Sequence, residues 1–291
     1  MRFCFLVEEQ YRNDGMPLDV VRQLRAWGHR VDVLRPGGSL LDLGELIRDG
    51  AHDAWVLKTV SGGPGLGLLE AAAGAGLTTI NDARAIRGVR DKARAAVLAE
   101  LAGLPVPVTW AAARTEDLAR IPVDRYPLVV KPADGSSGRA VHRVDAPEQL
   151  TALEQCPGSE GLLLAQPYVP NAGVDLKVYC AGGELFGTER TSPLARGGGP
   201  VRERPVALSP EVAAIATAVG EVYGLDLYGV DVLLGPDGPV VVDVNDFPSF
   251  RQVPDAVAKV SRAVLRLARN GSSWPSALPG AVRIPDQVGA V

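Results

Sequence analysis

Aromatic residues and long apolar runs are scarce in this sequence, and each scarcity excludes a class of function. Aromatic residues make up 5% of the 291 positions, which is too few to expect a base-stacking surface. The formal net charge is −4 and no large basic stripe is visible, so we expect no nucleic-acid partner. No apolar run approaches the roughly 18 to 20 residues of a membrane helix, so we expect no membrane span.

Cysteine and histidine are also scarce. The three cysteines, Cys4, Cys156 and Cys180, are odd in number and far apart, which favours buried thiols in a reducing compartment over disulfides or a zinc site. The three histidines are isolated, and none has a second histidine or a cysteine at metal-ligand spacing. Glu8 and Glu9 interrupt the first apolar stretch too early for a signal-peptide core. We therefore expect a cytoplasmic protein.

The remaining composition is typical of a globular protein, with 46% hydrophobic and 22% charged residues. Strand and helix patterns alternate through residues 1–82, and this rhythm predicts a parallel sheet with right-handed crossovers. From Asp91 onward a helical run is followed by short strands and then by longer strands and helices. Beyond Asn270 the chain is rich in Gly, Ser and Pro, so we expect a poorly ordered tail over residues 271–291.

A glycine-rich stretch, Gly62–Gly67, follows one predicted strand and opens a predicted helix, where backbone N–H groups could cradle a phosphate. However, Leu68 stands where the dinucleotide-binding pattern needs its third glycine, and no Lys-Ser/Thr pair follows as in a P-loop. The alternative is a plain turn, or a loop near a substrate.

The most informative pattern is a predicted hairpin in the last third of the chain. Gly235-Pro-Asp-Gly238 joins the predicted strands Leu227–Leu234 and Pro239–Asn245. Its Pro and Gly suit a type I turn closed by a left-handed glycine, which makes a three-residue loop. Such a loop sets Gly235 opposite Pro239.

This register predicts two carboxylates and an amide on one face of the hairpin. Counting back along both strands sets Asp231 opposite Asp243, and Asn245 shares their face because side chains alternate. The other face would be apolar throughout, formed by Val230, Val232, Leu234, Val240, Val242 and Val244. Opposed carboxylates repel unless a cation lies between them, and an all-oxygen set suits Mg²⁺. A solvated polar face, or one protonated carboxylate, is the alternative.

Three lysines occur where a nucleotide would explain them, since Mg²⁺ held by few protein groups usually implies bound phosphates. Lys131 ends an apolar strand before the Gly/Ser loop Gly135–Gly138, whose N–H groups could converge on phosphate oxygens. Lys92 lies at a helix start, where a cation opposes the helix dipole unless a phosphate is near. Lys177 alternates with Asp175 on one strand. The alternatives are a snorkelling lysine and an exposed ion pair.

Taken in order, these segments resemble the ATP-grasp superfamily, and the RimK/LysX type of ligase is closest in layout and length. The segments that carry the resemblance are Asp91-Lys92, Val129–Pro132 with its Gly/Ser loop, Gln166–Val169, Asp175–Lys177, Gly229–Asp231 and Asp243–Asn245. The resemblance implies an α/β fold with a parallel N-terminal domain (1–82) before an ATP-grasp domain (83–270). Two α+β subdomains of the latter, central (about 105–165) and C-terminal (about 166–270), would clasp ATP between them.

The resemblance implies a nucleotide site built from three groups of residues. The phosphate-binding lysines would be Lys92 and Lys131. The mobile loop over the phosphates would contribute Ser136, Ser137 and Gly138. The adenine hinge and the ribose site would be formed by Gln166, Tyr168, Val169 and Asp175.

The resemblance also implies a metal site and catalytic cations. Asp231, Asp243 and Asn245 would hold one or two Mg²⁺ ions, for which Mn²⁺ could substitute. Arg190 would contact the γ-phosphate or an acyl phosphate, with Lys177 as the second catalytic cation. On the substrate side, the expected residues are Lys58, Arg202 and Arg204.

Three positions depart from the RimK pattern. These ligases usually have Glu where Asp243 stands and Arg where Lys177 stands. After Asn245 they commonly continue Ser/His-x-Pro-Gly, whereas this chain has Asp246-Phe-Pro-Ser249, which is more similar to inositol trisphosphate kinases of the same fold. The departures leave nucleotide binding intact and put the acceptor in doubt.

Three functions therefore compete. The first is a ligase that joins a small-molecule or peptide carboxylate to an amine through an acyl phosphate, releasing ADP and phosphate. The second is a small-molecule kinase, which would need a strong basic cleft, and the candidates are Lys58, Arg190, Arg196, Arg202, Arg204 and Arg251. The third is a nucleotide-binding regulator without turnover. The sequence leaves the oligomeric state open, a homodimer included.

Overall fold

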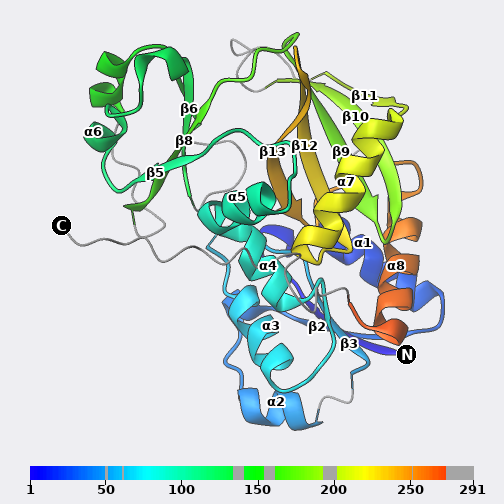
Figure 1. Ribbon diagram of the computed structural model, residues 1–291. Helices are drawn as coiled ribbons and strands as arrows, with labels where there is room; N and C mark the ends of the chain where they lie inside the picture. Colours follow the sequence, from blue (N-terminus) through cyan, green and yellow to red (C-terminus); the bar gives the residue numbers. More distant parts are fainter. Residues whose placement is uncertain are drawn as a thin grey trace.

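The computed structural model describes residues 1–49, 52–60, 62–133, 141–153, 161–192, 202–250 and 252–272. Within these residues the chain forms three sheets (Figure 1). Several sequence expectations lie outside the described residues, namely Cys156, Ser136, Ser137, Gly138, Arg196, Arg251 and the tail from residue 273.

The first sheet is parallel, as the alternating pattern of residues 1–82 predicts. Its strands, in the spatial order β2-β1-β3-β4, are β1 (Arg2–Leu6), β2 (Arg30–Leu34), β3 (Ala54–Leu57) and β4 (Thr79–Ile80). The helices of this region are α1 (Met16–Ala26), α2 (Leu43–Asp49), α3 (Gly65–Gly74) and α4 (Ala83–Arg90). The sequence pattern does not predict α4, whose first turn is capped by Asp82 accepting from the Arg84 N–H.

The second sheet is antiparallel and belongs to the expected central subdomain. Its strands, in the order β5-β8-β6-β7, are β5 (Trp110–Ala112), β6 (Leu128–Pro132), β7 (His142–Val144) and β8 (Leu163–Pro167). α5 (Lys92–Leu101) precedes this sheet, and the short α6 (Thr115–Leu118) packs beside it. In Figure 1, α5 lies between the second sheet and the third.

The third sheet is also antiparallel, in the order β11-β10-β9-β12-β13. Its strands are β9 (Val174–Ala181), β10 (Glu184–Thr191), β11 (Glu203–Val206), β12 (Leu227–Gly235) and β13 (Gly238–Asp246). The helices that follow and flank them are α7 (Pro210–Tyr223) and α8 (Ala256–Asn270). The structure thus confirms the predicted α/β class, with one parallel and two antiparallel sheets.

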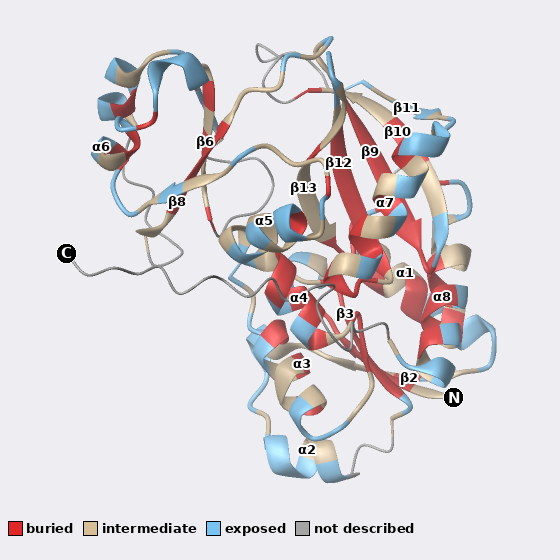
Figure 2. Cartoon of the chain, in the orientation of Figure 1, coloured by how far each residue is buried: buried red, intermediate tan, exposed pale blue. Residues whose placement is uncertain are grey.

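The two faces of the third sheet have different surroundings. One face packs Val178, Val230 and Val232 against α7 in a continuous apolar cluster. On the other face, one end of the sheet packs Tyr179 against α8 and the N-terminal sheet. Figure 2 shows these strands buried where the layers meet. The other end of that second face carries Asp175 and remains polar, which leaves room for a site.

The expected N-terminal and C-terminal regions share a core. One cluster contains Phe3 and Phe5 of β1 together with Phe247 and Phe250, all nearly or fully buried. Asn81, after β4, adds polar contacts to this junction. Its Nδ2 donates to the Leu227 carbonyl at 2.9 Å, and its Oδ1 accepts from the N–H groups of Asp226 and Leu227 at 3.0 and 2.8 Å.

Two expectations from composition can be compared with the described part of the chain. No helix in that part is long and apolar enough to cross a membrane. Cys4 and Cys180 are free, buried thiols, and burial raises the pKa of Cys4 to about 12. These two thiols are therefore protonated and unreactive at neutral pH.

Candidate active site

The β12–β13 hairpin turns differently from the prediction but brings together the same pair of carboxylates. Gly235 lies opposite Gly238, not Pro239, so the turn has two central residues and the predicted three-residue loop is wrong. The register then shifts after Asp231, where β13 has one extra residue in a bulge. Asp231 therefore lies opposite Asp243, because the bulge supplies the residue that the turn does not.

The bulge also changes which side chains face the core. Val241 is buried, whereas Val240 and Val242 are only half-buried and Leu234 at the hairpin tip is 54% exposed. The predicted apolar face is therefore wrong at these positions. Val242 has no partner in the β12 register, and its carbonyl accepts a hydrogen bond from Lys131 Nζ at 3.0 Å. Lys131 is thus anchored on β13 and does not snorkel to solvent.

Asp243 is surrounded by positive charge. Its Oδ1 is ion-paired with Lys92 Nζ at the start of α5, and its Oδ2 accepts from Asn245 Nδ2 at 3.3 Å. Burial alone would raise the pKa of the Asp243 carboxyl, but three nearby lysines lower it to about 2. Burial lowers the pKa of one of them, Lys131, although Asp243 opposes this. Asp243 is therefore ionised at neutral pH, as a metal ligand must be.

Asp231 binds two further cations on the same face. Lys177 Nζ lies 2.7 Å from Asp231 Oδ1, and Arg190 Nη2 lies 3.1 Å from Oδ2. Arg190 Nη2 also lies 3.4 Å from Asp175 Oδ2. The strand register explains these contacts, because Asp231 lies opposite Lys177 and Arg190 lies opposite Asp175. The alternative of an exposed Asp175–Lys177 pair is wrong, since both residues are buried and have other partners.

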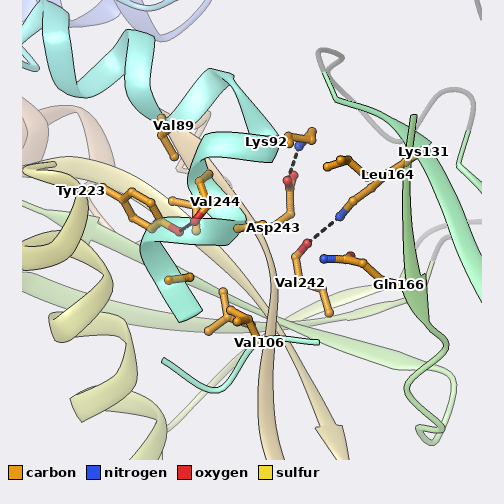
Figure 3. A pocket seen from close by; sticks show the side chains of 14 residues that line it. Val89, Lys92, Val106, Lys131, Leu164, Gln166, Tyr223, Val242, Asp243 and Val244 are labelled. Atoms are coloured by element: carbon orange, nitrogen blue, oxygen red, sulfur yellow. Dashed lines mark hydrogen bonds and ion pairs between the residues drawn. The ribbon is translucent and has the colours of Figure 1, made fainter. Parts of the chain in front are cut away.

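A pocket lies between α5, β13 and the central sheet, next to these charges (Figure 3). The predicted residues that line it are Lys92, Lys131, Gln166 and Asp243. In Figure 3 Lys92 comes from α5 and Lys131 from the central sheet, and their ammonium groups point to Asp243 and Val242 of β13. Leu164 and Val242 add an apolar wall, which the sequence did not point out. A pocket that combines charged and apolar side chains suits a phosphorylated ligand that also carries an aromatic ring.

The predicted hinge residues make defined contacts of their own. Gln166 Nε2 donates to Thr109 Oγ1 at 2.9 Å, which fixes its amide beside the pocket. The Tyr168 ring stacks with the Arg143 guanidinium, whose carbon lies 4.4 Å from the ring centroid. The Val169 carbonyl accepts from an asparagine side chain two residues on. Contacts of Tyr168 and Val169 with adenine, and of Asp175 with ribose, stay predictions.

Lys58, a predicted substrate residue, lies inside the protein. It is 7% exposed, and its Nζ donates to the Phe247 carbonyl at 2.5 Å. The ammonium also lies 5.5 Å from the centre of the Tyr11 ring. Lys58 is therefore not a solvated surface lysine. The hydrogen bond of Lys58 connects the N-terminal sheet to the end of β13. A contact of Lys58 with substrate stays a prediction.

The structure does not bring Arg204 to the site. Its guanidinium forms two hydrogen bonds with the Glu189 carboxylate, at 2.9 and 3.0 Å, on the exposed surface. Glu189 precedes Arg190 on β10, so it and Arg204 lie on the opposite face of the sheet. Arg202 is exposed and bonds through its backbone to Thr191. Its contact with a substrate stays a prediction.

Glu8 accounts for the glycine-rich stretch after β3. Its Oε1 accepts from the Gly65 N–H at the first turn of α3, at 2.7 Å, and its side chain is buried. A Cβ at Gly65 would lie 2.6 Å from that oxygen. Burial raises the pKa of Glu8, although the Gly65 N–H and Arg90 lower it. A carboxylate thus lies where a phosphate was considered, which favours the plain-turn alternative.

One polar cluster, which lies beside Asn245, was not predicted from the sequence. Asp246, Thr59 and Arg90 lie together behind β13, joined by hydrogen bonds and an ion pair. The available signals were an acidic residue directly after Asn245 and the consecutive charges of residues 90–92. Neither signal says that the three side chains meet, because they come from three separate segments.

The donor set fits Mg²⁺. Asp231 and Asp243 lie directly opposite each other, and Asn245 follows on the same strand, so two carboxylates and an amide lie close together. Asn245 Nδ2 donates to Asp243 Oδ2 at 3.3 Å, which holds the amide beside that carboxylate. Within the described ranges no three His, Cys, Asp or Glu side chains form a metal cluster. A small ligand set of this kind leaves positions for water and phosphate oxygens.

Known proteins resemble this chain in sequence. The model of the RimK-like ATP-grasp domain matches residues 89–263, which is more than half of the chain. A probable alpha-L-glutamate ligase from Methanococcoides burtonii is 30% identical over 196 residues, covering 63% of this chain and 64% of that relative. The alignment therefore spans less than two thirds of the relative's length.

Solved structures agree on the fold. The RimK domain ATP-grasp protein from Sphaerobacter thermophilus has a TM-score of 0.74 at 23% identity, covering 91% of this chain and 98% of its own. The ATP-grasp ligase PsnB, complexed with a minimal precursor, Mg and ADP, has a TM-score of 0.68 at 19% identity, covering 92% and 97%. Together with the match over residues 89–263, this shows that the chain belongs to the RimK-like ATP-grasp family.

Proposed function

We propose that this chain is an ATP- and Mg²⁺-dependent ligase that joins a carboxylate to an amine. The observation that carries the proposal is the opposed pair Asp231 and Asp243, with Asn245 beside them and basic side chains on both carboxylates. Such a site neutralises phosphate charge and positions reactants, which is the protein's main task in phosphoryl transfer.

Each residue of the site has a role in this proposal. Asp231, Asp243 and Asn245 would hold Mg²⁺, which supplies charge neutralisation at the phosphates of ATP when bound. Lys92 and Lys131 would exchange their present partners, Asp243 and the Val242 carbonyl, for phosphate oxygens. Asp243 and the Val242 carbonyl are neighbours on β13, so the two lysines are close enough to bind the same ligand.

Two cations remain for the transferred group. Arg190 and Lys177 both contact Asp231, and this places them on the same face as the metal ligands. The γ-phosphoryl group would pass from ATP to a carboxylate oxygen, giving an acyl phosphate and ADP. The amine nitrogen would then attack the acyl carbon, displace phosphate and lose a proton. Arg190 would stabilise the charge on the phosphoryl oxygens during both steps.

The kinase alternative receives less support from the described residues. The motif Asp246-Phe-Pro prompted it, and in this motif the Asp246 carboxylate and the Phe247 carbonyl are engaged by Thr59 and Lys58. Among the candidate basic residues, Lys58 is buried and Arg204 lies on the other face of the sheet. The described part of this surface therefore offers little to a polyanionic acceptor.

For the substrates, we propose an amino acid or a peptide as one partner. The support comes from the names of similar proteins, namely a probable alpha-L-glutamate ligase and PsnB with its minimal precursor. The departures at Asp243, Lys177 and Asp246 leave the acceptor's identity to experiment.

The test is a screen for ADP release. The full chain is incubated with Mg²⁺ and ATP, and with carboxylates and amines drawn from amino acids and dipeptides, singly and in pairs. The ligase proposal expects ADP only when a carboxylate and an amine are both present, with one product per ADP by mass spectrometry. ADP formation with an alcohol alone would favour the kinase. Mg·ATP binding without turnover across the panel would favour the regulator.

A further inference from the structure

Three side chains close a hydrogen-bonded network directly behind the metal ligands. Asp246 follows Asn245 at the end of β13, and its side chain is 5% exposed. Thr59 Oγ1, two residues past β3, donates to Asp246 Oδ2 at 2.5 Å. Arg90 Nη1, at the end of α4, donates to Thr59 Oγ1 at 2.9 Å and lies 3.6 Å from Asp246 Oδ1. The Thr59 hydroxyl thus uses both its donor and an acceptor position within the network.

Phe247, the residue after Asp246, is also held by hydrogen bonds. The Phe247 N–H donates to the Leu227 carbonyl at 2.7 Å, and its own carbonyl accepts from Lys58 Nζ at 2.5 Å. Its φ is +37°, a left-handed value that a residue with a side chain keeps only when its surroundings impose it. Its ring is fully buried against the N-terminal sheet. The end of β13 is therefore held at two consecutive residues by the segment after β3.

The network reaches both segments that meet at the metal site. Asp246 is the neighbour of Asn245 in sequence, and Arg90 lies two residues before Lys92. Lys92 pairs with Asp243. Any displacement of Arg90 relative to Asp246 would therefore shift the Lys92 ammonium relative to the metal-ligating strand.

We propose that Asp246, Thr59 and Arg90 are positioning residues that align Lys92 with the metal-ligating end of β13. The inference rests on the proposed Mg·nucleotide site. In this role Asp246 neither binds metal nor reacts, because its carboxylate is committed to Thr59 and Arg90. Asp246, where this chain departs from the pattern of related ligases, connects the segment after β3 of the N-terminal sheet to the site.

The test is the affinity of the full chain for ADP, measured by isothermal titration with excess Mg²⁺ and again with EDTA. Thr59→Val keeps the side-chain volume and removes both hydrogen bonds. We expect Mg·ADP to bind about tenfold more weakly, the equivalent of one or two lost hydrogen bonds. Metal-free ADP should lose less affinity than Mg·ADP, because only the contact of Lys92 with phosphate is affected there, whereas Mg·ADP also needs the aligned metal ligands of β13. Thr59→Ser, which keeps the hydroxyl, should bind like the wild type.

A matched control lies on the same helix. Arg87 of α4 forms two hydrogen bonds with the Glu70 carboxylate, at 2.8 and 2.7 Å, on the exposed side of α3. Arg90→Met should reduce Mg·ADP affinity as Thr59→Val does. Arg87→Met, which also removes a paired arginine from α4, should leave it unchanged.

The outcomes separate this inference from the function on which it rests. If the wild type binds no Mg·ADP, the proposed function fails and the positioning role fails with it. If the wild type binds Mg·ADP and Thr59→Val and Arg90→Met bind within twofold of it, only the positioning role is overturned. Equal losses of ADP affinity with Mg²⁺ and with EDTA would also overturn the positioning role, because a general loss of packing would weaken both kinds of binding equally.

Discussion

Replacing Asp243 by asparagine should weaken the fold as well as metal binding. The Asp243 side chain is 30% exposed, and it pairs with Lys92, which is 18% exposed. Its pKa falls from an ordinary 3.8 to about 2, because the attraction of nearby lysines exceeds the effect of burial. At roughly 1.4 kcal/mol per tenfold change in proton affinity, this charge contributes about 2 kcal/mol to the free energy of unfolding at neutral pH.

The pH dependence follows from the direction of the shift. Because the folded-state pKa of Asp243 is lowered, its contribution is complete above about pH 4 and is lost as the pH falls toward about 2. We expect urea unfolding to show Asp243→Asn about 2 kcal/mol less stable than the wild type at neutral pH. The difference should shrink across that acid window, and Mg·ADP binding should be lost at every pH.

Two further variants sharpen the measurement. Lys92→Met alone, and together with Asp243→Asn, completes a double-mutant cycle, and the double variant should lose less stability than the two single losses added together. Asp117→Asn, which removes the exposed partner of Arg114, should leave unfolding almost unchanged. The reasoning is refuted if Asp243→Asn matches the wild type at neutral pH, or if their difference persists unchanged at pH 2.

Two other predictions concern the framework around the site. Gly65→Ala should cost about 1–3 kcal/mol in thermal denaturation, since a Cβ there would lie 2.6 Å from Glu8 Oε1, whereas Gly67→Ala, with open space around its Cβ, should cost nothing. Equal melting temperatures for the two variants would contradict this. Asn81→Ala should cost on the order of 3 kcal/mol in urea unfolding, because it removes the acceptor of the Asp226 and Leu227 N–H groups and one of the donors to the Leu227 carbonyl. A loss below about 1 kcal/mol would show that water replaces the amide.

Local signals in the sequence were sufficient where one segment decides its own structure. α7 is an example, because Ser209 caps it, Pro210 takes the first helical position and Gly224 ends it in a left-handed conformation. The pairing of Asp231 with Asp243 was also predicted, by counting back along both strands from the expected turn. The correct pair nevertheless came from a wrong turn, because no residue of β13 signals a bulge.

Sequence patterns were less informative where distant segments meet. The burial of Lys58 depends on Phe247, 189 positions away in the chain, and no local pattern predicts that contact. Likewise, Arg204 looked available to a substrate until the register placed it on the opposite face from Arg190. Residue types therefore predicted the chemistry of the nucleotide side, whereas the substrate side depends on tertiary placement.

The core shared by the N-terminal sheet and α8 has a consequence for how this protein can be divided or exchanged. The region that matches the family model, residues 89–263, excludes Phe3 and Phe5, against which Phe247 and Phe250 pack. A fragment cut at those bounds would expose both rings to water, and it would also divide α8, which continues to Asn270. The N-terminal segment is therefore not an interchangeable module. A chimera that borrows it from a relative must also borrow the residues that face it, from Asp246 to the end of α8.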